Sequence, residues 1–404
     1  MDPRLIENMG WRMGEVYAAV TDQILINLAR HFKLIKEGGI PGGAWAYQVE
    51  RLAEMGKVTR ESEQIILNML GEADPALQYV LEESIRDALK GVEKPLRMAA
   101  EKGLLPGQGL LQPELSPSQT QAFQAFYRQS ADKLNLVNTV MLESTQNVYQ
   151  STVSDIVTRM SATQDILNVS AGEVITGVSS MNEAIRQGVK KMVENGITGF
   201  IDHGGHHWSP EAYVTMDIRT TLANTGRAAI WETMENYGDD LYMVSSHPGA
   251  RPLCYPWQGK VISRSGRRGE TKDGDGNRIQ IYAQEDTSYG EPAGLFGINC
   301  GHFPIPFIPG ASTPRPPEQD KKANDREYAE SQEQRRLERQ FRYQKRDLAV
   351  MKAQGEDEET IRAQRMKVNQ ARQELKDFCE ETGRARRVNR ERTPIKADFP
   401  DRKE

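Results

Sequence analysis

The sequence predicts an α+β protein that is mostly helical, with an elongated N-terminal region, a small β-containing central module and a charged helical C-terminal tail. The stretches on either side of residues 239–312 place apolar side chains at helical spacing. Residues 239–312 instead contain short apolar segments separated by Gly and Pro, which is typical of strands and turns. From Glu318 onwards Glu, Lys, Arg and Gln dominate. Breaker residues divide the chain into four expected segments: 1–108, 109–238, 239–312 and 313–404.

Bulk composition excludes several classes of protein. The 404 residues include 52 Lys plus Arg and 57 Asp plus Glu, and this net charge of −5 argues against a chain whose main role is to coat nucleic acid. The mean hydropathy is −0.64, and no apolar run approaches the ~18 residues that a membrane span needs. The N-terminus has no signal-peptide pattern. Three widely separated cysteines make no disulfide framework, so we expect synthesis in a reducing cytoplasm.

The N-terminal region reads as a series of helices. Apolar residues recur on one face over residues 15–36, and a Gly-rich stretch follows. We expect a second helix over 60–70 with Thr59 as its N-cap. A third is expected from Asp74-Pro75 towards Ala100, because Asp caps a helix and Pro fits its first turn. Gly103–Gly109 then marks a boundary.

A long helix is predicted next. Neither Gly nor Pro interrupts residues 118–171, and a helix over 118–160 would span about 60 Å. It is either an ordinary helix packed against the first arm or an assembly element that packs against copies of itself or a partner. Further helices are expected over 180–195 and from Ser209-Pro210 to Tyr237. In the latter, Arg227 could face a partner, an acidic core group or solvent.

A polar loop lies between these two helices. It contains Asp202, His203, His206 and His207, which are all residue types that bind metals. Adjacent histidines rarely converge on one ion, however, so we expect a polar loop with two glycines rather than a metal site.

The central module is predicted to contain three short strands, over 241–245, 259–263 and 279–282. Between the last two, Asp273-Gly-Asp-Gly-Asn277 superficially resembles a calcium loop. It lacks the flanking helices and the distal Glu that an EF-hand needs. We therefore expect a hairpin turn there.

Four residues of this module have coordination potential: His247, Cys254, Cys300 and His302. Thiolate and imidazole suit zinc in a closed tetrahedral site. In a flat strand Cys300 and His302 would point to the same face. One interpretation is therefore a structural zinc. A second is a buried cysteine and hydrogen-bonded histidine pair that packs the module. A third is a cysteine nucleophile with His302 or His247 as its base.

The tail begins with a Pro-rich, stiff exit over residues 304–317. Apolar residues at near-heptad spacing then predict two helices, suited to a helical hairpin, to pairing with a partner, or to lying on the N-terminal arm. The near-heptad positions are Leu337, Phe341, Leu348, Met351, Ile361, Val368, Leu375 and Phe378. A basic, flexible end follows. Its arginines could contact DNA phosphates without sequence preference, or simply be solvated; they are Arg384, Arg386, Arg387, Arg390 and Arg392.

Two motifs of the central module resemble a known family. They are SSHPGARPLCYPWQGK over residues 245–260 and FGINCGHFPIPFIPG over residues 296–310. Both resemble the signature of the phage minor capsid protein 2 family, which is similar to the Mu-F-type head-morphogenesis proteins of tailed phages. The resemblance implies a virion component in the capsid interior near the portal, made in the host bacterial cytoplasm. It implies a role in head assembly, DNA packaging or DNA delivery, and it does not imply catalysis.

The leading hypothesis from the sequence is thus a structural phage head protein. Its expected partners are the portal protein, capsid or scaffold proteins, and packaged DNA through the basic tail. One alternative is a zinc- or cysteine-dependent hydrolase or nuclease centred on the four Cys and His residues. Another is a non-specific DNA-binding protein that uses Arg384–Arg392 and the turn at Arg264–Arg268.

Overall fold

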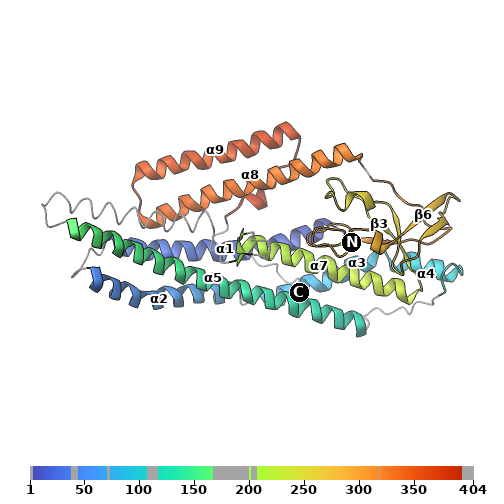
Figure 1. Cartoon of the computed structure of the whole chain (residues 1–404), viewed down its shortest axis with the longest axis horizontal. Coiled ribbons are helices and arrows are strands. Elements are labelled where there is room, and N and C mark those ends of the chain that lie inside the picture. Colours follow the sequence, from blue (N-terminus) through green and yellow to red (C-terminus); the bar gives the residue numbers. More distant parts are fainter. Residues whose placement is uncertain are drawn as a thin grey trace, which may run out of the picture. The chain divides into compact units, whose positions relative to one another are not determined.

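The computed structural model describes residues 3–37, 44–70, 73–106, 117–166, 200–201, 207–317 and 319–393. The fold is α+β and mostly helical, as predicted (Figure 1). Its helices are α1 (Pro3–Glu37), α2 (Ala44–Leu70), α3 (Ala73–Lys90), α4 (Glu93–Glu101), α5 (Pro117–Ile166), α7 (Pro210–Asn236), α8 (Lys321–Gln354) and α9 (Glu358–Thr382). No helix among these residues is long and apolar enough to cross a membrane.

The described residues form two compact units, each built from three separate stretches. Unit 1 contains Met1–Trp11, Asp74–Lys133 and Thr215–Glu333, and unit 2 contains Arg12–Ala73, Leu134–Val214 and Gln334–Glu404. The four consecutive segments expected from breaker residues stay a prediction. The central module lies wholly within unit 1.

A five-stranded mixed sheet forms the β part of unit 1. Its strands are β3 (Leu241–Val244), β4 (Val261–Ser263), β5 (Gly269–Lys272), β6 (Arg278–Ala283) and β7 (Pro304–Pro306), in the order β5-β6-β4-β3-β7. β4 and β6 pair in parallel and the other pairs are antiparallel. Three strands were predicted; β5 and β7 were not. A separate two-stranded pair joins β1 (Phe200–Ile201) to β2 (His207–Trp208) in unit 2.

The sheet buries both faces because successive side chains of a strand point to opposite sides. Tyr242 and Val244 of β3 share a core with Ile230 and Met234 of α7 and with Leu96 of α4. On the other face, four side chains form a smaller cluster: Leu241, Val261, Ile281 and Phe307. The sheet is therefore held against α7, which the site described below also uses.

Unit 1 contains one buried carboxylate with two donors on another helix. Asp217 of α7 is 1% exposed. It accepts hydrogen bonds from the hydroxyl of Ser130 at 2.6 Å and from Nζ of Lys133 at 2.5 Å, both on α5. These bonds supply the partners that a buried charge requires.

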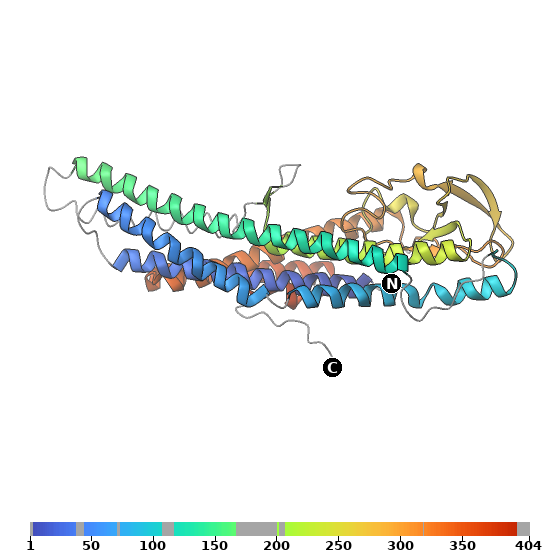
Figure 2. The ribbon, with the colours of Figure 1, turned by 90° about the horizontal axis from the view of Figure 1, so that it is seen from below.

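Unit 2 is built on α1, α2 and α5, whose segments in this unit run side by side (Figure 2). Tyr149 of α5 stacks on Phe32 of α1 at 5.7 Å between ring centroids, and its hydroxyl donates to the carbonyl of Arg51 on α2 at 3.3 Å. Val137, Met141, Tyr149, Val153 and Ile156 of α5 are buried. These residues recur at about i, i+4 spacing, so one face of α5 is buried against other helices of the same chain.

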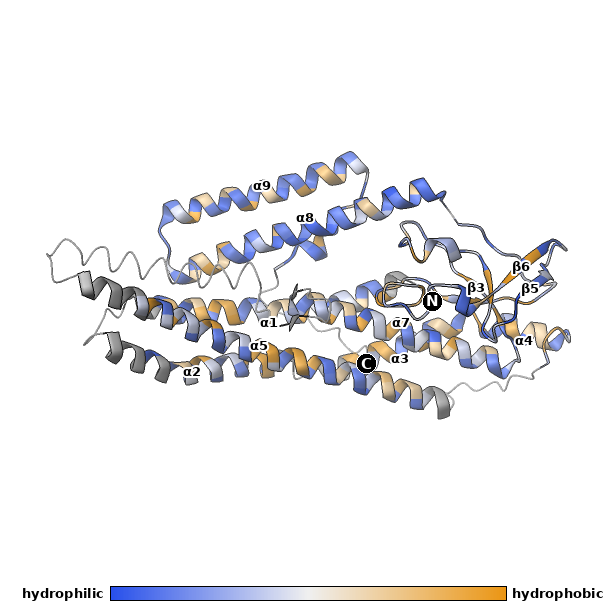
Figure 3. Cartoon of the chain, in the orientation of Figure 1, coloured by the Kyte–Doolittle hydropathy of each residue, from blue (hydrophilic) through white to orange (hydrophobic). Residues whose placement is uncertain are grey.

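The α8–α9 pair forms the predicted helical hairpin, although its seam differs from the predicted one (Figure 1). Leu337 and Phe341 pack on Ala371, Leu375 and Cys379. In the last turns of α8, Val350 is buried, whereas Leu348 and Met351 are only half-buried. Most of both helices is hydrophilic (Figure 3), so the apolar seam between them is narrow.

Several helix boundaries differ from the predicted ones. α2 begins at Ala44, and Thr59 lies inside it, with its hydroxyl donating to the carbonyl of Met55 at 2.9 Å. A turn at Gly91 separates α3 from α4 where one helix was expected. The helix expected over 180–195 and most of the polar loop at Asp202–His206 lie outside the described residues.

Candidate metal centre

The register of β3 with β7 brings the two histidines of the module together. Val244 pairs with Pro304, and the next residues continue the contact, since the amide of Ser245 donates to the carbonyl of Phe303 at 3.0 Å. His247 follows β3 and His302 precedes β7. Their rings therefore face each other, with centroids 4.2 Å apart.

Cys254 lies in the connection from β3 to β4. It immediately precedes a short 3₁₀ helix, Tyr255–Trp257, and its amide donates to the carbonyl of Arg251 at 2.9 Å. The connection is closed by Gly259, whose amide donates to the carbonyl of Val244 at 2.9 Å. This turn directs the Cys254 side chain into the core, where it is 1% exposed.

Cys300 lies in a strained turn that is anchored to α7. Phe296 and Asn299 have φ values of 60° and 56°, a left-handed conformation that costs energy for residues other than glycine. The amide of Phe296 donates to Sγ of Cys300 at 3.2 Å, and its carbonyl accepts from Arg227 at 2.6 Å. The amide of Asn299 donates to the hydroxyl of Thr220 at 3.1 Å. The strain is confined to the turn that positions this sulfur.

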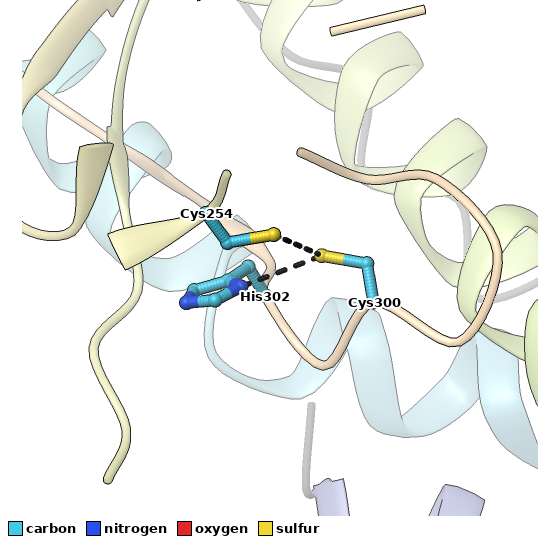
Figure 4. A group of neighbouring side chains, drawn as sticks. All are labelled: Cys254, Cys300 and His302. Atoms are coloured by element: carbon cyan, nitrogen blue, oxygen red, sulfur yellow. Dashed lines mark hydrogen bonds between the residues drawn. The ribbon is translucent and has the colours of Figure 1, made fainter. Parts of the chain in front are cut away.

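Three of the four candidate residues converge on one point (Figure 4). The two sulfurs of Cys254 and Cys300 are 3.9 Å apart, and Sγ of Cys300 lies 3.4 Å from Nδ1 of His302. All three ligand atoms lie within 4.8 Å of one another, and all three residues are buried. Cys300 and His302 were expected on one face of a strand. They lie instead in the loop before β7, and it is the loop that makes them converge.

The hydrogen bond between the two sulfurs shifts the pKa values of the two thiols in opposite directions. The bond from the Cys254 thiol holds the pKa of Cys300 far below its usual value, and His302 and Arg227 act in the same direction. The same bond, together with burial, raises the pKa of Cys254. Negative charge is therefore favoured on Cys300 over Cys254.

Arg227 provides the nearby positive charge. The sequence left open whether it faces a partner, an acidic group or solvent; in the described part of the chain it is buried and donates to the backbone carbonyls of Ala223 and Phe296. It is buried beside the rings of Phe296 and Phe303, at 5.2 and 6.0 Å from their centroids. Burial lowers its pKa to about 10, so it stays charged at neutral pH and favours the Cys300 thiolate.

Comparison with known proteins identifies the chain at this point. The family described as phage minor capsid protein 2 matches residues 1–380, which include both motifs of the central module. The chain belongs to this family. A structural protein of Lactococcus phage LL-H is 30% identical over 315 residues, which are 75% of this chain and 77% of that protein. No solved structure matches the chain. This minor capsid protein is a structural component of the phage virion.

The tail arginines of the minor capsid protein are largely engaged within unit 2. Arg384 donates to Gln334 at 2.8 Å, and Arg386 pairs with Glu391. Arg390 is buried and lies 3.7 Å from Glu338. A short 3₁₀ helix, Val388–Glu391, orders this segment, which we expected to be flexible. Arg392 is exposed, and Arg387 makes contacts of its own.

The turn at Asp273 has the predicted character. The Asp273 carboxylate accepts hydrogen bonds from the amides of Asp275 and Asn277 at 3.0 and 2.8 Å and from the side chain of Asn277 at 3.1 Å. Its oxygens are thus occupied by its own loop between β5 and β6, as in a hairpin turn.

Proposed function

We propose that this minor capsid protein binds the portal protein inside the phage head and acts in head assembly and in DNA packaging or delivery. The observation that carries the proposal is the family match over residues 1–380, together with two motifs that resemble the signature of this family, which is similar to the Mu-F-type head-morphogenesis proteins. Those motifs occupy residues 245–260 and 296–310. Both motifs contain residues that are buried in the core of unit 1, such as Cys254 and Cys300.

Burial supports a structural rather than a catalytic role. Cys254, Cys300 and His302 are each at most 5% exposed. A cysteine nucleophile must be accessible to its substrate, and reactive cysteines are partly exposed. Sγ of Cys300 instead points into the core, where it accepts a hydrogen bond from the amide of Phe296 and contacts Sγ of Cys254 and Nδ1 of His302. We therefore propose that the protein is not an enzyme.

Charge pairing supports a protein partner over DNA as the main one. Of the five tail arginines considered as phosphate contacts, Arg386 and Arg390 have acidic neighbours within unit 2. Phosphate contacts would have to compete with these carboxylates. Packaged DNA stays a secondary partner in the proposal, through the exposed Arg392.

Heads assembled with and without portal protein test the proposal. If binding to the portal protein brings the minor capsid protein into the head, heads assembled without portal protein should lack it. Their major capsid protein should still be present in normal amount. Quantitative mass spectrometry of purified heads measures both proteins in one sample. Equal amounts of the minor capsid protein in both kinds of head would contradict portal binding and indicate a partner in the capsid shell.

The enzyme alternative is tested separately, with purified protein and two cysteine variants. Cys300→Ser removes the thiolate. A hydrolase or nuclease that depends on Cys300 loses its activity in this variant, whereas the Cys379→Ser control, in α9, retains it. The proposal expects no such activity from purified wild-type protein, and an activity abolished by Cys300→Ser alone would overturn it.

A further inference from the structure

We propose that the minor capsid protein binds one structural zinc ion through Sγ of Cys254, Sγ of Cys300, Nδ1 of His302 and Nε2 of His247. This inference is independent of the portal proposal. It concerns the folding of the central module and would hold for any partner of the protein.

Two of the three distances among the converging atoms match zinc coordination, and all three atoms lie within 4.8 Å of one another. In a tetrahedral site with bonds of about 2.3 Å to sulfur and 2.0–2.1 Å to nitrogen, two sulfurs lie about 3.8 Å apart and a sulfur and a nitrogen about 3.5 Å apart. The distances here are 3.9 Å between the sulfurs and 3.4 Å from Cys300 Sγ to His302 Nδ1. The ligand atoms are thus positioned around a common centre before any ion is considered.

The surroundings of His302 also indicate a ligand. The residue is 1% exposed, and its Nε2 has no hydrogen-bond partner among the described residues. Its one polar contact in that part of the chain is the sulfur of Cys300. A buried imidazole normally satisfies its nitrogens with oxygen partners. An imidazole directed only at a cysteine sulfur is better explained by a soft metal that both residues bind.

His247 is the residue that can complete the set. Its Nδ1 lies 3.0 Å from the carbonyl oxygen of Pro248, so Nδ1 carries the proton and Nε2 the lone pair. The ring lies against that of His302, and Nε2 is buried. A side-chain rotation of His247 towards the sulfurs is the change that metal binding requires.

The second layer of contacts suits a bound thiolate. The amide of Phe296 donates to Cys300 Sγ, and Arg227 fixes Phe296 by binding its carbonyl. The strained φ of Phe296 persists because these two bonds hold it in place. Residues outside the ligand set that orient the ligands are a regular feature of metal sites.

The rival interpretation is a redox pair. The sulfurs at 3.9 Å need to approach to about 2.0 Å to form a disulfide. Oxidation would remove both thiolates as metal ligands. A zinc site and a Cys254–Cys300 disulfide are therefore mutually exclusive. Measuring bound zinc and the disulfide in the same protein sample distinguishes them.

The test measures metal in the full-length protein purified under reducing conditions. Inductively coupled plasma mass spectrometry is expected to find one zinc per chain in the wild type and in the control Cys379→Ser. This control changes the third cysteine, which packs in the α8–α9 hairpin. Cys254→Ser, Cys300→Ser and His302→Ala are each expected to lose at least tenfold in bound zinc. Circular dichroism checks that the variants keep their helices.

Cobalt substitution tests the coordination. The wild type should show the charge-transfer and visible bands of a tetrahedral cobalt–thiolate site, and His247→Ala should shift the visible bands. An unshifted spectrum would overturn the assignment of His247. Chelation should lower the Tm of the wild type, and added zinc should restore it. Absence of zinc from the wild type, full zinc in Cys300→Ser, or a Cys254–Cys300 disulfide in protein from mature heads would overturn the site.

Discussion

Arg346 of α8 forms a buried ion pair with Asp22 of α1, although the two residues are 324 positions apart in the sequence. The same guanidinium lies 3.5 Å from a carboxylate oxygen of Glu211, at the start of α7. All three side chains belong to unit 2 and are buried. One cation thus joins three helices whose apolar stripes alone would not fix their relative register.

Replacing this cation should destabilise unit 2 strongly. Arg346→Met leaves the Asp22 and Glu211 carboxylates buried without their shared partner, and breaking a buried pair costs about 3–5 kcal/mol. Urea unfolding followed by circular dichroism measures the change. The matched control is Arg365→Met, which removes an exposed pair with Glu358 on α9 and should have a far smaller effect. Equal losses in the two variants would show that the buried cluster has no special role.

The α8–α9 hairpin should depend on its narrow seam. Leu375 is fully buried between the helices, and Leu375→Ala is expected to cost about 2–5 kcal/mol because it leaves a cavity. Met366 lies on the same helix but is 69% exposed, so Met366→Ala serves as the control and should change stability little. If α9 were held mainly by surface charges, the two variants would behave alike, and high salt would unfold the hairpin.

A buried carboxyl group in unit 1 makes stability depend on pH. Burial raises the pKa of Asp239 to about 7, and its Oδ2 has no hydrogen-bond partner in the described part of the chain. In the unfolded chain an Asp pKa is about 3.9. Between roughly pH 4 and pH 7 the folded state therefore holds more protons than the unfolded state, and the free energy of unfolding falls as pH rises.

Asp239→Asn tests this slope. The variant cannot ionise, so it should be more stable than the wild type by on the order of 4 kcal/mol at pH 8 and nearly equal to it at pH 4. Glu338 has its pKa raised to about 7 by burial in unit 2, but it is unchanged in the variant and drops out of the difference. Asp132→Asn, an exposed change on α5, is the control. A stability difference between Asp239→Asn and the wild type that does not change with pH would contradict a raised pKa of Asp239.

Local sequence signals predicted the elements but not their pairing. The apolar alternation at Ile279–Tyr282 correctly indicated a strand, yet its parallel pairing with β4 depends on the path of the intervening loop. β7 was missed because Pro304 and Pro306 read as a stiff exit. Proline is tolerated there because β7 is an edge strand and needs fewer amide donors. Helix breaks such as Gly91 were missed because one glycine is a weak signal.

The candidate site was found by residue type and not by geometry. Cys254, Cys300 and His302 were singled out because thiolate and imidazole are zinc ligands, but their irregular spacing gave no coordination pattern. Convergence arises from the turn at Phe296 and from the β3–β7 register, which are both long-range features. Arg227 had no signal beyond an arginine in an otherwise apolar stretch of helix, and its carbonyl partner is 69 residues away.

The most direct test of the central claim is the mass of the complex formed when this protein and its portal protein are expressed together. Native mass spectrometry of the co-purified material should show a stable complex of defined stoichiometry. Co-expression with the major capsid protein is the control and should give no such complex. Recovery of the minor capsid protein only as a free chain beside intact portal rings would contradict portal binding.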